Sequence, residues 1–303
     1  MKFIKKTLFY AIALVGIFVL MLVLWVAVAP HISLLVFNID MGNWWFGSTK
    51  LPALTAAKPS AHFYGDTAVS IGKIRIKVVY AVPKDKVGEV KGSLEDAVNS
   101  ALSKTASFHF LQTRGLSKIQ YEVFTEPVVL TEESSFYEST PGESLNHRGF
   151  AAVAEEIVRR IFKEDGDLYD ESFARFVASE YPVLGIIYEG PGAAGGVVLK
   201  KELGPTSEFA KKTGLPETIV YTADIGNIKG FFLISRGFLT DVAYQAFGPT
   251  FLYHEFAHTI GLAERQDAGL PESDDVMGNG RREPIESAYI DQDILREVGI
   301  IQN

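Results

Sequence analysis

The chain of 303 residues has a net charge of −8. Residues 1–29 hold three Lys and no acidic residue, so the remainder carries 26 basic and 37 acidic side chains and has a net charge of −11. This acidic balance argues against nucleic acid as a partner. The chain contains no Cys, which excludes a fold held by disulfides, so stability must come from core burial and bound ligands. The absence of Cys also fits a prokaryotic cell surface better than an animal ectodomain.

An uncharged apolar run of 22 residues, Leu8–Ala29, follows three lysines. At about 1.5 Å per residue, a helix of this length spans the hydrocarbon core of a bilayer. The basic residues 1–7 should stay in the cytoplasm, which predicts a single-pass membrane protein with an extracytoplasmic domain. A cleaved signal peptide is the alternative, because Ala27–Ala29 has the small-x-small pattern, but Pro30 and the length of the run favour a retained anchor.

Residues 30–65 are predicted to form a juxtamembrane stalk. The aromatic group Trp44–Phe46 fits either the headgroup level of a bilayer or the core of the following domain. From Ser48 to Ser60, Pro, Ala, Lys and Thr dominate, which is typical of a short linker. Ser60–Asp66 is compatible with a stalk and equally with a strap over a binding site. A folded domain is expected over residues 66–303, which is long enough for a substantial core.

Helical and strand-like patterns alternate along this domain. Arg148–Phe162 has apolar residues at helical spacing, with paired acids early and paired arginines late, and it is the clearest helix of the first half. A second helix is expected at Ser93–Leu111. Strands are expected at Lys73–Val82, Lys118–Leu130, Val183–Tyr188, Gly196–Lys200, Thr218–Ala223 and Gly230–Ser235.

The segment Gly190–Gly195 matches the dinucleotide-binding pattern G-x-G-x-x-G. That fingerprint requires a helix whose N-terminus faces a pyrophosphate, whereas Val197–Lys200 predicts a strand. We therefore interpret the segment as a hairpin or mobile loop. Its glycines would allow another backbone to approach closely.

A helix that carries two histidines follows the last predicted strand. Pro249 lies in its first turn, and the helix is expected to run through His254 and His258 to Gly261. Two histidines four residues apart project from one face of a helix, so their imidazoles can converge on a tetrahedral metal. Glu255 lies beside that position, where a carboxylate can take a proton from a water that the metal acidifies. The pattern predicts one catalytic Zn²⁺.

Further residues extend the motif beyond the second histidine. Gly261 follows it by three residues, where the helix must stop and glycine permits the left-handed conformation. Glu264 stands at the last position of H-E-x-x-H-x-x-G-x-x-H and can ligate zinc, with Asp267 as the alternative third ligand. Met277 follows within the sequence Val-Met-Gly.

With these residues the chain resembles the metzincin clan of zinc peptidases, in which the extended motif precedes a methionine turn beneath the metal. The resemblance covers residues 254–278. It implies that His254 and His258 are ligands, that Glu255 is the general base and that Met277 forms the floor of the site.

Glu264 is the departure from the clan, whose members usually have His and occasionally Asp at that position. The fold that the resemblance implies is α+β: a mixed twisted sheet, the active-site helix, the methionine turn and a C-terminal helix. Amphipathic spacing places that last helix at Ile285–Val298. Arg281 and Arg282, directly after the turn, fit a solvated pair better than partners of a carboxylate.

The expected function is that of a membrane-anchored, zinc-dependent endopeptidase whose partners are peptide or protein substrates. The competing hypothesis is a surface-anchored module that binds zinc and peptide without turnover. Retention of Glu255 argues against it, because a general base has no structural duty at the metal. The histidines outside the motif have no ligand spacing and are expected to be surface or core residues: His31, His62, His109 and His147.

Overall fold

The computed structural model describes residues 70–89, 94–124, 126–138, 147–199, 220–264, 273–297 and 300–301. They belong to one compact unit, Thr55–Asn303. The predicted anchor and stalk lie outside the described residues. Within the described part, no helix is long and apolar enough to cross a membrane.

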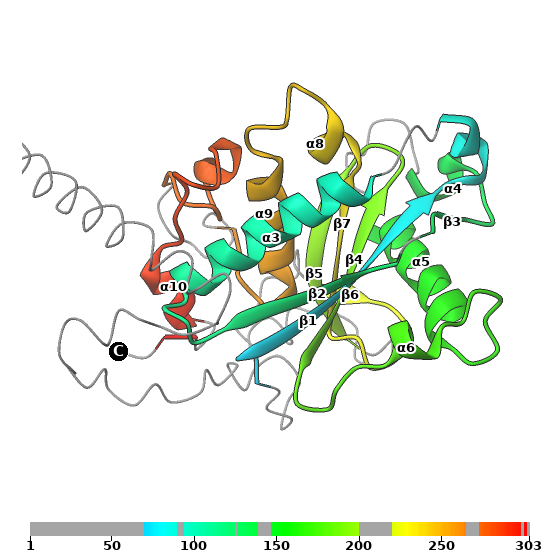
Figure 1. Cartoon of the computed structure of the whole chain (residues 1–303), viewed down its shortest axis with the longest axis horizontal. Helices are drawn as coiled ribbons and strands as arrows, with labels where there is room; N and C mark the ends of the chain where they lie inside the picture. Colours follow the sequence, from blue (N-terminus) through cyan, green and yellow to red (C-terminus); the bar gives the residue numbers. More distant parts are fainter. Residues whose placement is uncertain are drawn as a thin grey trace, which may run out of the picture. The chain divides into compact units, whose positions relative to one another are not determined.

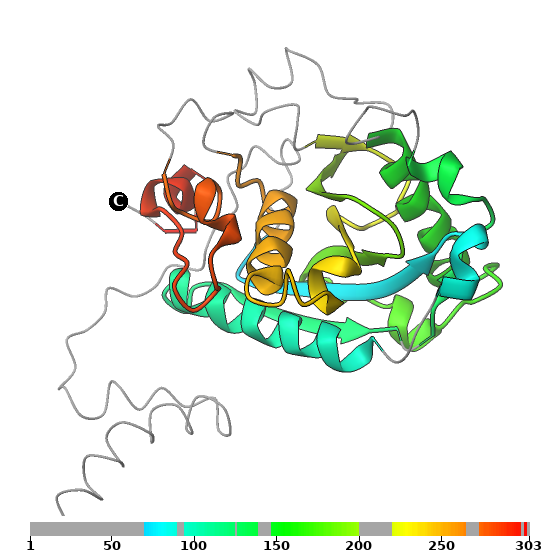
Figure 2. The same cartoon turned by 90° about the horizontal axis from the view of Figure 1, so that it is seen from above.

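A twisted sheet of mixed strand direction forms the centre of the described domain (Figures 1 and 2). The strand order is β2-β1-β4-β7-β5-β6, and β3 also pairs with β1. The strands β1, β2, β3, β4 and β7 are parallel to one another, β5 runs antiparallel to β7, and β6 is parallel to β5. Their bounds are β1 Lys73–Val82, β2 Lys118–Val123, β3 Val128–Val129, β4 Tyr181–Tyr188, β5 Ala193–Leu199, β6 Val220–Thr222 and β7 Gly230–Ser235.

Helices cover both faces of this sheet (Figure 2). One face carries α3 (Glu95–Gln112), α9 (Gly248–Thr259) and α10 (Gln292–Glu297). The other carries α5 (His147–Ile157), the π-helical turn η2 (Val158–Phe162) and α6 (Glu171–Ala174). Shorter helices lie between these elements: η1 Lys84–Glu89, α4 Ser134–Glu138, α8 Gly237–Thr240 and η4 Asn279–Arg282.

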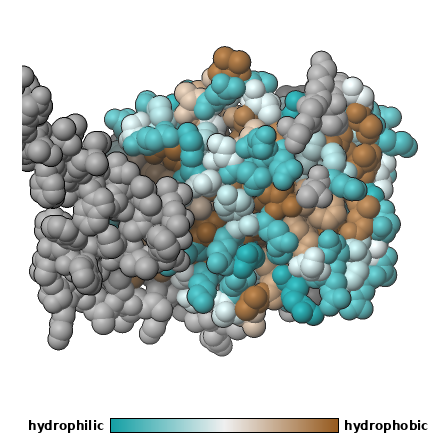
Figure 3. All heavy atoms as spheres, viewed as in Figure 1, coloured by the Kyte–Doolittle hydropathy of each residue, from teal (hydrophilic) through white to brown (hydrophobic). Residues whose placement is uncertain are grey.

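The alternation of side chains along the strands divides the core into two clusters. Ile74, Ile76 and Val78 of β1 pack with α3 and α9, whereas Val79 and Ala81 pack with α5. Every residue of β4 is buried, as expected for a parallel strand covered on both faces. The predicted mixed sheet with helices is therefore confirmed. On the face shown in Figure 3, hydrophilic side chains alternate with apolar ones.

The strand predicted at Lys118–Leu130 is two strands. Both pair with β1, Val123 opposite Val78 and Val128 opposite Ala81. Pro127 precedes the second strand and has no amide hydrogen to donate to a ladder, so the pairing is interrupted there. The helix predicted at Arg148–Phe162 is observed as α5 followed directly by η2.

Of the two interpretations of Gly190–Gly195, a hairpin or a mobile loop, the hairpin is wrong. β4 lies between β1 and β7, and β5 pairs on the far side of β7, so the segment crosses over one strand. The exclusion of a dinucleotide site is consistent with the structure, because β5 begins at Ala193 where that fingerprint requires a helix.

The helix predicted at Ile285–Val298 begins only at Gln292. Upstream of it, backbone groups bond to distant partners: the Tyr289 carbonyl accepts from Val276, and the Ile290 amide donates to Gln112. A helix through these residues would have to break these bonds, so tertiary pairing overrides the amphipathic pattern.

Gly195 allows α9 to lie directly against β5. A Cβ atom built on this glycine would lie 1.9 Å from the Glu255 carbonyl oxygen, far inside contact distance. Gly195 therefore permits a close approach of strand and helix, and this contact occurs at the residue next to His254.

We expect Gly195→Ala to push α9 away from the sheet and to lower the free energy of unfolding by about 1–3 kcal/mol. Chemical denaturation of the purified chain measures this loss. Gly88→Ala is the matched control, because a Cβ atom there meets nothing within 4 Å. Equal stability of the two variants would contradict the close packing.

His109 of α3 is one of the histidines without motif spacing, and it is a core residue. Its side chain is fully buried, Nδ1 lies 3.0 Å from the Tyr253 hydroxyl, and Nε2 lies 2.7 Å from the Ser117 hydroxyl. Burial lowers the pKa of His109 to about 3. The folded protein therefore holds this residue neutral at a pH where an unfolded chain protonates it.

The free energy of unfolding should consequently fall as the pH drops from about 6.5 toward about 3, by up to about 1.4 kcal/mol per pH unit from this residue. Urea unfolding at a series of pH values, with a chelator present, should give a shallower pH dependence for His109→Gln than for the wild type. Equal slopes would mean that His109 titrates normally in the folded state.

Candidate metal centre

Helix α9 carries its polar side chains into the interior. It packs against β5 and β7 on one side and against α3 on another, and ten of its residues are buried. His254, Glu255 and His258 are 2%, 6% and 5% exposed. Buried polar groups are costly unless they are bonded, so each of these side chains requires a partner.

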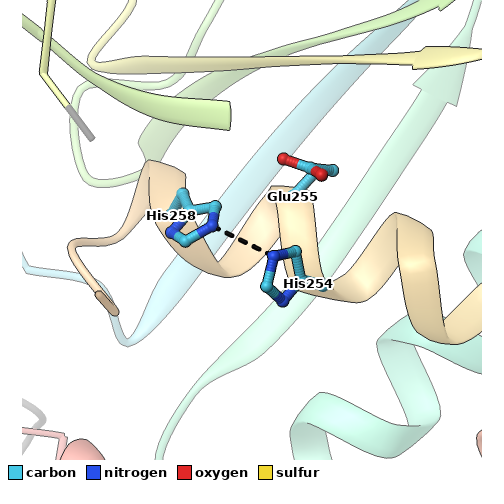
Figure 4. Close-up of side chains that lie close together, drawn as sticks. All are labelled: His254, Glu255 and His258. Atoms are coloured by element: carbon cyan, nitrogen blue, oxygen red, sulfur yellow. Dashed lines mark hydrogen bonds between the residues drawn. The ribbon is translucent and has the colours of Figure 1, made fainter. Parts of the chain in front are cut away.

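The two histidines face one another on this helix (Figure 4). Their Nε2 atoms are 3.2 Å apart. Two nitrogens bound to one tetrahedral zinc at ordinary bond lengths lie about 3.3 Å apart. With Glu255, the histidines offer three ligand atoms within 4.8 Å of one another, so this buried group could hold a metal ion.

Backbone carbonyls orient both imidazoles. His254 Nδ1 lies 2.8 Å from the Val276 carbonyl oxygen, and His258 Nδ1 lies 2.7 Å from the Leu262 carbonyl oxygen. A carbonyl only accepts, so each Nδ1 carries the proton and each neutral ring presents an Nε2 lone pair. Two such lone pairs at this separation repel one another unless a cation, either a proton or a metal ion, lies between them.

The end of α9 places the second of these carbonyls. Gly261 has a φ of 88°, its amide donates to the His258 carbonyl, and the Leu262 amide donates to the Ala257 carbonyl. These two bonds form the helix-ending motif that requires a left-handed residue, for which glycine is suited. The predicted stop at Gly261 is thus observed, and the reversal returns the Leu262 carbonyl to His258.

Neighbouring charges and burial shift the pKa values of Glu255, His258 and His254. Burial raises the pKa of Glu255 to about 7, with the charge of His254 opposing the rise. Burial and the neighbouring charge of His254 lower the pKa of His258. For His254, burial opposes protonation, but the neighbouring Glu264 carboxylate and the charge of Glu255 outweigh it, so its pKa is raised. Protonation of His254 is therefore easier than that of a free imidazole.

Glu264 lies beside the histidines, and Arg281 lies beside Glu264. A Glu264 carboxylate oxygen is 3.7 Å from His254 Nε2 and 3.2 Å from Arg281 Nη1. The neighbouring His254 is the main reason that the pKa of Glu264 lies well below its usual range. The interpretation of Arg281 as solvated is wrong, because this arginine pairs with a carboxylate at the site. The alternative ligand, Asp267, lies outside the described residues.

The turn that contains Met277 contacts α9. Met277 is 1% exposed and belongs to the same core cluster as α9. Its neighbour Val276 supplies the carbonyl for His254. This role was missed from the sequence because a backbone carbonyl is present in every residue and leaves no signal in the side-chain pattern. Arg281 could have been recognised from its place directly after the turn.

No protein-family model and no curated protein matches this chain.

Zinc added to the metal-free protein should raise the melting temperature, because only the folded state brings the ligand atoms together. Differential scanning calorimetry of the full-length chain measures the shift, and His254→Ala or His258→Ala should abolish it. A zinc-independent melting temperature in the wild type would contradict a metal site.

The zinc-dependent shift in melting temperature, which reports zinc affinity, also separates the two candidates for the third ligand. If Glu264 binds the ion, Glu264→Gln should weaken zinc affinity by at least about tenfold, whereas Asp267→Asn should leave it nearly unchanged. The opposite pattern would assign the ligand to Asp267.

Proposed function

We propose that this chain is a zinc-dependent endopeptidase in which His254, His258 and Glu264 hold one zinc ion and Glu255 is the general base. The observation that carries the proposal is the separation of 3.2 Å between the two histidine Nε2 atoms. The carbonyls that bind both Nδ1 atoms support it, since they leave only the Nε2 lone pairs for a ligand. Metzincin-like chemistry would follow from this donor set.

Zinc fits the donor set better than the alternatives. Two imidazoles and one carboxylate are a ligand combination of catalytic zinc sites, in which a fourth position stays open for water or substrate. Magnesium and calcium prefer oxygen ligands throughout, which the buried histidines do not offer. Arg281 pairs with Glu264 and would hold its carboxylate toward the ion, as partners of ligating carboxylates do.

When bound, zinc supplies the Lewis acidity that makes a water nucleophilic near neutral pH and polarises the scissile carbonyl. Glu255 takes the proton from the attacking water and delivers it to the leaving amine. Burial raises the pKa of Glu255 in the metal-free chain, and a group whose pKa lies near the working pH can accept a proton and then give it up. Burial of Glu255 also keeps bulk water from competing for that proton.

The proposed setting is the outer side of a membrane. The apolar run Leu8–Ala29 would anchor the chain with its basic N-terminus in the cytoplasm, and residues 66–303 would reach peptide or protein substrates outside it.

Glu255→Gln should lower peptide release from an unstructured protein by about 10²- to 10⁴-fold, because it removes the general base and leaves the proposed ligands in place. Mass spectrometry of the products, with zinc and the full-length chain, measures the effect. Glu286→Gln is the matched control, since Glu286 is exposed and pairs only with Lys104 among the contacts described.

If the wild type binds zinc and releases no peptide, the inactive binding module would replace the peptidase. Equal release by wild type and Glu255→Gln would remove Glu255 from the role of base.

A further inference from the structure

The beginning of the described domain and the end of α3 meet at one end of the fold (Figure 1). Ser70, the first described residue, is where the chain arrives from the predicted anchor and stalk. The Lys118 amide donates to the Gly72 carbonyl, and the Ser117 hydroxyl donates to the Ile71 carbonyl. These bonds hold the turn between α3 and β2 against the start of β1, so the chain enters the domain beside this turn.

Three exposed cations lie at this end of the domain, and together they form the basic surface: Lys73, Arg114 and Lys118. Among the described residues, none of the three has an acidic partner at ion-pair distance. Residues 70–84 and 97–121 contain no Asp or Glu, although the whole chain holds 37 acidic and 29 basic residues. Positive charge is therefore concentrated on the segments that build this end of an acidic chain.

The side-chain ladder between β1 and β2 ends in a pair of like charges. The two inner pairs of this ladder are hydrogen-bonded: Lys77 with Glu122 and Arg75 with Gln120. The outermost pair is Lys73 opposite Lys118. Like charges opposite each other on neighbouring strands repel. This pair lowers the stability of the folded chain unless an anion lies near both ammonium groups.

Arg114 has a backbone conformation that suits glycine. Its φ is 53°, and within the described part of the chain it is the one residue other than glycine with a positive φ. An ordinary side chain loses stability in this left-handed region. The guanidinium donates to Gln292 at 2.7 Å, which orients the group and leaves its charge uncompensated. The arginine therefore adds a charge to this surface at a conformational cost.

The acidic side chains of the neighbouring α10 segment have other partners. Asp293 pairs with Arg296, and the Asp291 carboxylate accepts the Asp293 amide at 2.9 Å. Neither carboxylate forms an ion pair with a cation of the basic surface among the contacts described. The basic surface therefore keeps its positive charge in the folded domain.

Apolar side chains accompany the basic surface. Leu111 in the last turn of α3 is 66% exposed, and Tyr289 is 45% exposed. The Ile290 amide donates to the Gln112 side chain at 3.1 Å, so the segment of Tyr289 lies against the end of α3. Cations together with exposed Leu and Tyr are typical of surfaces that bind an anionic bilayer, where cations meet headgroup phosphates and aromatic rings lie at headgroup level.

We propose that the basic surface docks on the anionic headgroups of the bilayer in which the chain is anchored. The inference rests on the proposed membrane setting and is independent of the metal. A headgroup phosphate near Lys73 and Lys118 removes their repulsion, and another binds the Arg114 guanidinium. Each Lys or Arg beside an anionic bilayer strengthens association about fivefold, so three cations strengthen it about 100-fold.

Docking at this end also orients the candidate metal centre. Helix α3 is bonded along its length to α9: Thr105 donates to the Pro249 carbonyl, and His109 lies 3.0 Å from the Tyr253 hydroxyl. A bilayer that holds the end of α3 therefore holds α9 at a fixed orientation.

A fluorescent probe at residue 111 tests the docking. The chain contains no Cys, so Leu111→Cys provides a single labelling site in the full-length protein. The labelled chain is reconstituted into vesicles of phosphatidylcholine with or without phosphatidylglycerol. In the anionic vesicles the emission should shift to the blue and spin-labelled lipids should quench it. High salt should reverse both signals, because it screens exposed charges.

A probe at residue 136 is the positional control. Phe136 is 58% exposed on α4, which contacts η1 beyond the other end of β1. Phe136→Cys should therefore give the same emission in both kinds of vesicle.

Charge variants of the chain labelled at residue 111 assign the signal to the basic surface. Lys73→Gln and Lys118→Gln should each lower the ratio of docked to undocked chain about fivefold. Arg114→Gly should lower it equally while the melting temperature stays the same or rises, because glycine tolerates the left-handed backbone. A lower melting temperature with unchanged docking would leave Arg114 only a structural role. Lys84→Gln is the matched control, since Lys84 is exposed at the other end of β1.

The outcomes are decisive for the basic surface. Equal emission from residue 111 in the two kinds of vesicle overturns the docking, and so does docking that survives all three substitutions. Equal quenching at residues 111 and 136 also overturns it, because the contact would then be unspecific. If alkaline extraction releases the chain from the vesicles, the predicted anchor is wrong, and co-sedimentation with the same vesicles then measures the basic surface alone. All of these outcomes leave the proposed zinc peptidase to its own tests.

Discussion

The burial of α9 is the constraint on which the site depends. The helix lies between the sheet and α3, and it brings His254, Glu255 and His258 into a region with almost no solvent. Two imidazoles that face one another at 3.2 Å need a cation between them. The fold therefore places a demand for positive charge at one buried point, which a proton or a metal ion can meet, and the Glu255 carboxylate nearby offers a further ligand atom.

Several parts of the chain that are distant in sequence maintain this arrangement. Gly195 of β5 lets the helix approach the sheet at Glu255, and the left-handed Gly261 reverses the chain after the second histidine. The methionine turn contributes the Val276 carbonyl, and the residues before α10 bind that turn through Tyr289. The two imidazoles are oriented by backbone carbonyls, and these carbonyls are present whichever side chains the residues carry.

Charge is distributed unevenly around the helix. Beyond its C-terminal end lie Glu264 and Arg281, paired at 3.2 Å. Four aromatic rings lie at its N-terminal end and on the preceding segment: Phe238, Tyr244, Phe247 and Phe251. The candidate ligand His254 and the aromatic ring of Phe251 are therefore neighbours on one helix.

The sequence by itself determined the features that depend on neighbours along the chain. The spacing of His254 and His258 sets their common helix face, and Gly261 marks the end of that helix, because both follow from helix geometry alone. Strand β1 was likewise predictable at its observed bounds from alternation, and the later strands from short runs between turn signals. Only the tertiary structure decided which distant groups meet. The position of β5 beyond β7, the late start of α10, the carbonyl partner of His254 and the pairing of Arg281 with Glu264 all depend on contacts across the fold. Local pattern cannot specify these contacts, because backbone donors and acceptors are the same in every residue and pair according to where the chain brings them.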